Sequence, residues 1–525
     1  MRILKDYMFK YDKKNVYFLF IILLFSNIVF LVIGLEPNGL SLNKPFKIEG
    51  DTKEYISSSE NLICGKGYTF YKVSNDIEFV SNISNKKENE KAIFYSFRSP
   101  GFAFFYVTFR FFLNQQNALI TFIIFQTILN AFAKLIIALM IYNFTKNKFL
   151  FILSVFILGT VPFFSQYNNL ILTDSLGLSF LIFAFYFFIK AIEKNFKFKT
   201  LILSGFLFTI AVFLRPFLFL PFALAAFLLL NLLFSQTNFK NIIVTLLCFG
   251  FSFIIIDSIW IIRNYYYTEK FIPLASTLHF QDHKHSSFQE IKKISGSLGY
   301  SNNWWDIESP VHWFYNKSDN RKVNVIFSEE EISIANQNKI LKSRNYMFNS
   351  IEKKIKLEER IFLEKKSEKL LKEINLDFRQ NNFFNTRIKN RLSILVKFIN
   401  QPIQRDFHSV RYPFNVTLVF YNHLVVNSIL WIGFFASVLF LFGNQMIGVK
   451  YLSFCTLIII LFFTFVLLSY EYREIYTMMG FLVISSFILL NKLKTSHFLL
   501  KTSIIAIVIL AFVQSFYQTL FEINW

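Results

Sequence analysis

A succession of apolar runs, each about as long as a bilayer is thick, constrains this chain more than any other feature. The first is "VYFLFIILLFSNIVFLVIGL" (residues 16–35), and comparable runs recur up to the C-terminus. A helix that crosses a membrane needs roughly 20 mostly apolar residues. Because hydrophobic residues make up 54% of the chain, a soluble fold would leave too much apolar surface in water. The sequence therefore predicts an all-α polytopic membrane protein.

The apolar runs predict eleven membrane helices. We place them at 17–35, 118–142, 149–165, 173–190, 200–214, 217–234, 241–262, 417–442, 450–469, 475–490 and 499–519. The stretch 101–113 is short and carries Arg110, so it is interpreted as a helix that lies at the membrane interface. Lys and Arg are concentrated in the N-terminus and in the short loops on its side of the membrane, which predicts a cytoplasmic N-terminus.

This alternation places two long segments on the extracytoplasmic side, the first loop (36–117) and the segment 263–416. We expect three parts: a transmembrane catalytic module (1–262), an extracytoplasmic and largely helical domain (263–416), and C-terminal transmembrane helices (417–525). The middle part is predicted helical because apolar residues recur at three- and four-residue spacing among Glu and Lys. The first apolar run lacks a small-residue cleavage site, so we interpret it as a retained anchor.

Charge and cysteine content restrict the partners. The net charge of +21 is compatible with nucleic acid, but in a membrane protein it indicates basic cytoplasmic flanks near anionic lipid. We therefore expect the membrane as a partner and no nucleic acid. The three cysteines are scattered along the chain, so neither a disulfide framework nor a cysteine metal site is indicated.

Ionisable residues gather at the ends of different predicted helices, all on the predicted extracytoplasmic side. They are Asp51, Glu54, Arg98, Asp174, Arg215, Arg263 and Arg473. Charges near the apolar zone are costly and usually mark a site. Guanidinium groups hold phosphate through charge-assisted hydrogen bonds, and a carboxylate accepts a proton from an attacking hydroxyl or amine. Such a set suits a polyprenyl-phosphate sugar, although a single helix-end Arg is also a headgroup anchor and Asp174 is also a helix cap.

Five short motifs, in this order, resemble the GT-C superfamily of polytopic glycosyltransferases, in the branch of protein mannosyltransferases and aminoarabinose transferases. "GDTKEY" (50–55) matches a D-x-x-x-Y motif after the first helix, and "RSPGF" (98–102) matches a basic residue with Pro and Gly before an interfacial helix. "LTDSLG" (172–177), "FLRPF" (213–217) and "IIRNYYYTEKFIPLAST" (261–277) follow. The late element "YEYREIY" (470–476) matches only approximately.

The resemblance implies inverting transfer of a sugar from a polyprenyl-phosphate donor to a lipid, glycan or protein acceptor, at the outer face of the bacterial cytoplasmic (inner) membrane. Asp51 would be the general base, and Asp174 a second catalytic carboxylate that orients donor or acceptor. Residues that would bind substrate are Glu54, Tyr55, Arg98, Arg215, Arg263 and Arg473. Glu54 has an alternative as an ion-pair partner of Lys53 or Lys66. No cofactor is expected, and a divalent metal is the alternative.

Several alternatives remain open at this point. A pyrophosphate-dependent oligosaccharyltransferase or ligase would use the same base chemistry, and a transporter or flippase would also bind a lipid-linked sugar. A non-catalytic protein of an envelope complex is a third hypothesis. His279, Asp282, His283 and His285 lie within seven residues, but their spacing fits no established zinc site. Trp304, Trp305 and Trp313 are candidates for stacking on a sugar or for the membrane interface.

Overall fold

The structure is a computed structural model of the chain, and it describes most but not all of it. The described residues are 13–33, 51–70, 93–94, 98–234, 239–268, 271–275, 286–300, 309–327, 332–351, 357–381, 384–399, 414–442, 445–467, 472–493 and 498–521. The chain divides into two compact units, which we describe separately. The transmembrane unit comprises Met1–Thr277, Pro402–Leu457 and Ile475–Trp525, and the polar helical unit comprises Leu278–Gln401 and Ile458–Glu474.

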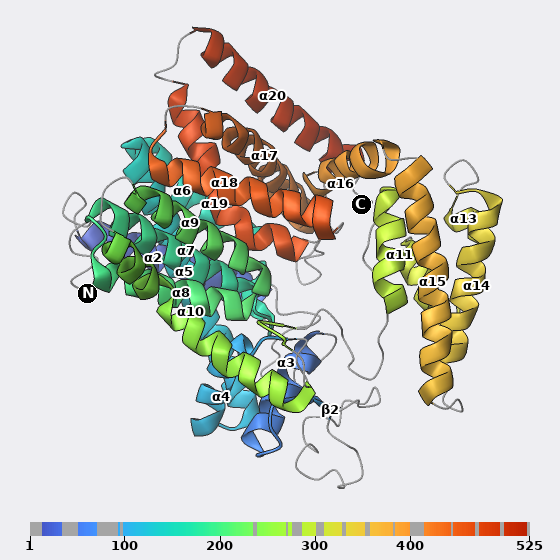
Figure 1. The fold of residues 1–525 in the computed structure, drawn as a ribbon. Coiled ribbons are helices and arrows are strands. Elements are labelled where there is room, and N and C mark those ends of the chain that lie inside the picture. Colours follow the sequence, from blue (N-terminus) through green and yellow to red (C-terminus); the bar gives the residue numbers. More distant parts are fainter. Residues whose placement is uncertain are drawn as a thin grey trace. The chain divides into compact units, whose positions relative to one another are not determined.

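The described part of the transmembrane unit is built almost entirely from helices (Figure 1). Its N-terminal part contains α2 (Lys13–Ile33), α3 (Asp51–Ile63), α4 (Gly101–Phe112), α5 (Gln115–Thr145), α6 (Lys148–Thr160), α7 (Asp174–Glu193), α8 (Phe198–Leu214), α9 (Phe219–Phe234) and α10 (Phe239–Thr268). Its C-terminal part contains α17 (Phe414–Phe442), most of α18 (Ile447–Leu461), α19 (Tyr472–Lys492) from Ile475, and α20 (Phe498–Phe521). A two-residue antiparallel pair, β1 (Thr69–Phe70) with β2 (Ile93–Phe94), is the strand structure of the described residues.

The helices confirm an all-α polytopic membrane protein. Eight described helices are long and apolar enough to span a bilayer. In α7 and α19, 83% of the residues in the apolar window are buried, the largest share among the eight. The other three predicted spans correspond to shorter apolar helices, at Lys148–Thr160, Phe198–Leu214 and Ile504–Tyr517. The count of eleven therefore remains a prediction. The predicted interfacial stretch 101–113 is the shorter helix α4.

One predicted boundary is wrong for a clear reason. The span predicted at 149–165 ends at Thr160, where Val161 becomes extended and Pro162 opens a 3-10 turn, η2 (Pro162–Phe164). Proline lacks the amide proton that an α-helix needs and disfavours helical backbone in the residue before it. A second 3-10 turn, η3 (Gln166–Asn169), follows, and α7 begins at Asp174. The segment 161–173 is thus irregular, and nearly all of it is buried.

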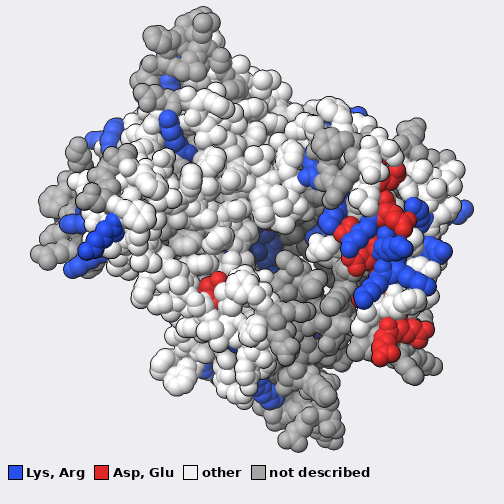
Figure 2. Space-filling model, in the orientation of Figure 1, with Lys and Arg blue, Asp and Glu red and all other residues white. Residues whose placement is uncertain are grey.

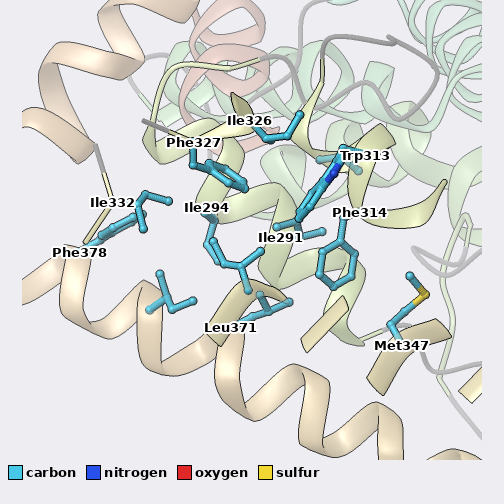
Figure 3. Packing of buried hydrophobic residues seen from close by; sticks show 13 residues of the cluster. Ile291, Ile294, Trp313, Phe314, Ile326, Phe327, Ile332, Met347, Leu371 and Phe378 are labelled. Carbon is cyan, nitrogen blue, oxygen red and sulfur yellow. The ribbon is translucent and has the colours of Figure 1, made fainter. Parts of the chain in front are cut away.

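The polar helical unit has a hydrophobic core of its own. Its elements are α11 (Ser286–Ser297), α12 (Pro310–Tyr315), α13 (Val323–Ile326), α14 (Ile334–Ile351), α15 (Leu357–Asn381), the π-helices η5 (Asn385–Lys389) and η6 (Phe462–Leu467), and α16 (Asn390–Ile399). Trp313, Phe314 and Phe327 interdigitate with Ile and Leu side chains of α11, α14 and α15 (Figure 3). Trp313 is fully buried, and its indole N–H donates to the Arg321 carbonyl at 2.9 Å. It therefore offers no ring face to a sugar, while Trp304 and Trp305 lie outside the described residues.

The surfaces of the two units differ in charge. Lys, Arg, Asp and Glu side chains crowd together over the polar helical unit, whereas the face of the transmembrane unit seen in the same view is mostly uncharged and carries scattered Lys and Arg side chains (Figure 2). Exposed pairs such as Lys339–Glu373, 3.1 Å apart, account for part of this pattern. The amphipathic pattern of 334–381 thus covers an apolar core with a solvated polar face.

Candidate functional site

Asp51 and Glu54 occupy the first turn of α3, and both bind the same arginine. The Arg98 Nη2 atom is 2.5 Å from Asp51 Oδ1, and its Nε donates to Glu54 Oε2 at 2.8 Å. All three side chains are less than one-third exposed. Arg98 is thus a partner of Glu54 that its sequence neighbourhood did not suggest. A planar guanidinium suits this task because its N–H groups point at two carboxylates at once.

A second carboxylate–guanidinium pair joins the start of α7 to the end of α8. Asp174 is the first residue of α7 and is fully buried, and it forms an ion pair with Arg215, which caps the C-terminus of α8. Arg215 is 12% exposed. Gly177 lies one turn further along α7, where an added Cβ would come within 3.2 Å of Arg215 Cγ. The glycine of the "LTDSLG" motif therefore leaves room for the arginine of "FLRPF".

Further contacts link the two pairs through their neighbours in sequence. The Tyr55 hydroxyl lies 3.2 Å from Thr173 Oγ1, so α3 touches the start of α7. Ser99 donates to the Phe213 carbonyl at 2.5 Å, so the Arg98 segment touches the end of α8. The contacts therefore form a closed ring that runs from α3 through α7 and α8 to the Arg98 segment and back to α3. We call the two ion pairs and these linking contacts the charged ring.

Gly101 explains why the Arg98 segment can lie so close to α8. A Cβ at this position would clash with the backbone carbonyl of Phe213 and would lie 2.6 Å from the Leu214 nitrogen. Backbone atoms cannot move aside as a flexible side chain can, so only glycine permits this approach. The Pro-Gly pair before α4 thus brings Arg98 towards the turn that carries Arg215.

Arg263 lies beside the charged ring but makes different contacts. Its guanidinium donates to the Tyr68 carbonyl and to Asn264 Oδ1 (2.8 Å), and it lies 4.7 Å from the Trp260 ring. Tyr68 connects Arg263 to the charged ring, because the Tyr68 hydroxyl donates to the Ser99 carbonyl at 3.4 Å. Burial raises the pKa of the Tyr68 phenol well above its ordinary value, so the hydroxyl keeps its proton and remains a donor.

Glu60 is a site neighbour that sequence reasoning missed. It lies two turns along α3 from Asp51, is 5% exposed, and accepts hydrogen bonds from Tyr106 and from Arg110 Nε (3.0 Å) on α4. Burial, and then the negative charge of Glu60, raise the pKa of the Tyr106 phenol. Arg110 is thus bound to protein instead of entering lipid alone. Its acidic partner is fifty residues away in sequence, so no local pattern pointed to the pair.

The structure does not test the remaining sequence candidates. Arg473 lies in the first turn of α19, in the part that belongs to the polar helical unit, and its role remains a prediction. His279, Asp282, His283 and His285 lie outside the described residues. Within the part of the chain that the structure describes, no group of three or more His, Cys, Asp or Glu side chains is arranged to hold a metal ion.

Comparison with known proteins adds one result. Residues 127–261 match the family model described as dolichyl-phosphate-mannose-protein mannosyltransferase. No curated protein matches the chain. The matched segment runs from α5 to α10 and contains Asp174 and Arg215.

An all-α membrane protein with ion-paired carboxylates and arginines at its helix ends fits the class of polytopic membrane glycosyltransferases. The match over residues 127–261 is to the protein-mannosyltransferase family within the GT-C superfamily, and it agrees with the resemblance for the "LTDSLG" and "FLRPF" motifs that lie in this segment. The chain is accordingly an integral membrane protein, and the match supports a glycosyltransferase of the GT-C type.

Proposed function

We propose that the protein is an inverting glycosyltransferase that moves a sugar from a polyprenyl-phosphate donor to an acceptor at the outer face of the cytoplasmic membrane. The observation that carries this proposal is the charged ring, which places two carboxylates, each paired with a guanidinium, at the ends of helices distant in sequence. One group of each kind is what such a reaction requires: a proton acceptor for the incoming group and a cation for the departing phosphate.

Asp51 is the proposed general base. Asp51 lies in the first turn of α3 and pairs with Arg98. The acceptor hydroxyl or amine gives its proton to Asp51 while its lone pair bonds to the anomeric carbon of the sugar. The bond between that carbon and the phosphate oxygen breaks on the opposite face, so the configuration inverts and polyprenyl phosphate leaves. Atoms and charge balance without a further reactant.

Arg98 and Arg215 are the proposed phosphate ligands. Glu54 binds Nε of Arg98 and Asp51 binds Nη2, so the two carboxylates orient this guanidinium for the donor phosphate. Asp174 holds Arg215 and orients the donor or acceptor. Tyr55 links the two halves of the ring and is proposed to contact substrate. Arg263 has a weaker case, since the Tyr68 carbonyl and three aromatic rings already surround its guanidinium.

The orientation of the chain follows from this proposal. The ring would face the extracytoplasmic side of a bacterial inner membrane, the N-terminus would be cytoplasmic, and the acceptor would be a lipid, a glycan or a protein. The positive-inside distribution of Lys and Arg in the short loops supports this orientation.

The test separates the base from the phosphate ligands. We expect Asp51→Asn to lower turnover of dolichyl-phosphate mannose in nanodiscs by roughly 10²–10⁴-fold, because the amide cannot accept the proton. Donor affinity should change far less. Arg98→Ala should weaken donor binding first, since it removes a charge-assisted contact. Asp377→Asn, the same substitution on α15 of the polar helical unit, is the matched control and should change neither quantity.

Two results would contradict the proposal. One is near-normal turnover by Asp51→Asn. The other is movement of labelled lipid-linked sugar across proteoliposomes with no transfer to any acceptor, which would favour the transporter hypothesis. The wild-type protein is the reference in both assays, so its transfer from the chosen donor is measured first.

A further inference from the structure

The irregular segment 161–173 places backbone that is not α-helical inside the transmembrane unit. Every residue of it is buried except Leu170, which is half-buried. Away from water, each backbone N–H and C=O without a partner costs several kcal/mol. Irregular backbone at this depth is tolerated only where protein groups bind it. Since this segment ends at Asp174, whatever binds it also sets the position of that carboxylate.

The binding groups come mainly from one face of α5. Gln126, Asn130 and Lys134 are spaced four residues apart, so their side chains lie on the same face of that helix, and all three are buried. The Gln126 side-chain amide donates to the carbonyls of Asn168 and Leu170, at 2.7 Å each. One side chain therefore binds these two carbonyls closely, and it also reaches the Tyr167 carbonyl at 3.4 Å.

The other two side chains bind side chains of the same segment. Asn130 Oδ1 accepts from the Asn168 amide at 3.3 Å, and Lys134 Nζ donates to Ser165 Oγ at 2.7 Å. Asn27 on α2 completes the network, because its Oδ1 accepts from Lys134 (2.6 Å) and its amide donates to Asn130 (3.1 Å). Side-chain amides do not pass protons along, so this network holds its members in place and does not conduct a proton.

A short path connects this network to the charged ring. Ser175, the residue after Asp174, donates to Asn168 Oδ1 at 2.6 Å. Asn168 is thus bound from α5 through its backbone and its amide, and it binds the first turn of α7 in return. Asp174, in the same turn, pairs with Arg215. Each step of the path is a hydrogen bond or ion pair between buried groups.

We propose that Gln126, supported by Asn130 and Lys134, is a positioning residue that holds Asp174 in register with Arg215 for the transfer reaction. This inference rests on the proposed function, because it assigns Gln126 a role in turnover through Asp174. The Gln126 amide donates to carbonyls of the irregular segment, so its effect on Asp174 passes through the backbone between Asn168 and Asp174.

Gln126→Met is the informative variant, because methionine keeps the length of the side chain but cannot donate to the two carbonyls. In the full-length protein in nanodiscs, we expect deuterium exchange of the amides in 161–175 to rise by at least about tenfold. Turnover of dolichyl-phosphate mannose should fall on the order of 10²-fold, the cost of a small misplacement at a reacting site. The KM for the donor should move much less than kcat.

Thr127→Val is the matched control on the same helix. Thr127 is equally buried, but its hydroxyl binds Ile123 within α5, so neither exchange nor turnover should change. Ser175→Ala removes the hydrogen bond from the Ser175 hydroxyl to Asn168. It is the variant to measure if Gln126→Met does not fold. It should lower kcat in the same direction by a smaller factor.

Unchanged exchange in Gln126→Met would overturn the inference, and so would increased exchange with wild-type kcat. A wild-type protein that transfers no sugar would instead refute the proposed function. In that case the exchange difference between Gln126→Met and Thr127→Val still decides whether Gln126 holds the segment, so the two failures are distinguishable.

Discussion

The ion pair between Asp174 and Arg215 yields a quantitative prediction. Asp174 has no exposed surface and Arg215 is 12% exposed, so the pair lies almost entirely in protein. Replacing Arg215 with Met keeps the apolar stem but leaves the buried carboxylate without this guanidinium. Removing one partner of a buried pair costs on the order of 3–5 kcal/mol of unfolding free energy. We therefore expect Arg215→Met to lose that amount and Asp174→Asn to lose a comparable one.

The double variant makes the prediction specific to the pair. In Asp174→Asn/Arg215→Met neither charge remains, so the loss should be smaller than the sum of the two single losses by about 0.5–3 kcal/mol. The measurement is equilibrium unfolding in detergent micelles, followed by far-ultraviolet circular dichroism. Lys339→Met is the control: its pair with Glu373 is about 40% exposed on both sides, and such pairs contribute about 1 kcal/mol or less. A loss below about 1 kcal/mol for Arg215→Met, or additive losses in the double variant, would refute the reasoning.

Two further predictions concern Gly101 and Asp319. Gly101→Ala should lower the thermal unfolding midpoint and abolish transfer, because the new Cβ meets the backbone of Phe213; an unchanged midpoint would show that the α4–α8 approach is not tight. In the polar helical unit, hydrogen bonds from the Arg321 side chain lower the pKa of Asp319. The stabilisation is therefore complete above the unfolded carboxyl value of about 4 and is lost as pH falls through the folded pKa. Asp319→Asn should lower the unfolding free energy of this unit by on the order of 1.5–3 kcal/mol at neutral pH. It should also remove the loss of stability at acidic pH, measured by deuterium exchange of residues 309–327. A loss at acidic pH identical to that of the wild type would contradict this.

The fold was largely predictable because its signal is local. An apolar run of bilayer length specifies a helix without reference to the rest of the chain, and the eight long spans follow that rule. The failure at 149–165 came from following hydropathy across Pro162. Apolar composition continues through Phe163 and Phe164, but the missing amide proton ends the helix first.

The site was predictable only in its outline. Motif order selected Asp51, Arg98, Asp174 and Arg215, and the structure places them in one ring of contacts. The pairing within that ring was not readable, because Glu54 and Arg98 are forty-four residues apart and closer lysines competed for Glu54. Arg263 was grouped with these residues by its helix-end position. Its partners include the Trp260 indole and the Tyr68 carbonyl, whereas Arg98 and Arg215 pair with carboxylates.

The polar face of α5 was missed although one signal was present. Lys134 stands inside an apolar run, and an ionisable residue there is a site candidate by default. Its partners Asn27 and Ser165 are 107 and 31 residues away, so spacing alone did not identify them. Gln126 gave no signal, since a single amide in a long apolar helix is compatible with many environments.

The shortness of α6 has a consequence for the thickness of the surrounding lipid. Its 13 residues, at a rise of about 1.5 Å each, cover about 20 Å, whereas the 20 residues of α7 cover about 30 Å, the full hydrocarbon layer of a typical bilayer. The segment 161–173 makes up the difference of about 10 Å inside the protein. Lipid beside α6 therefore meets a hydrophobic surface shorter than its own acyl chains require, and a bilayer relieves such mismatch by thinning. Thinning at this place would lower the headgroup plane towards the level at which α6 ends.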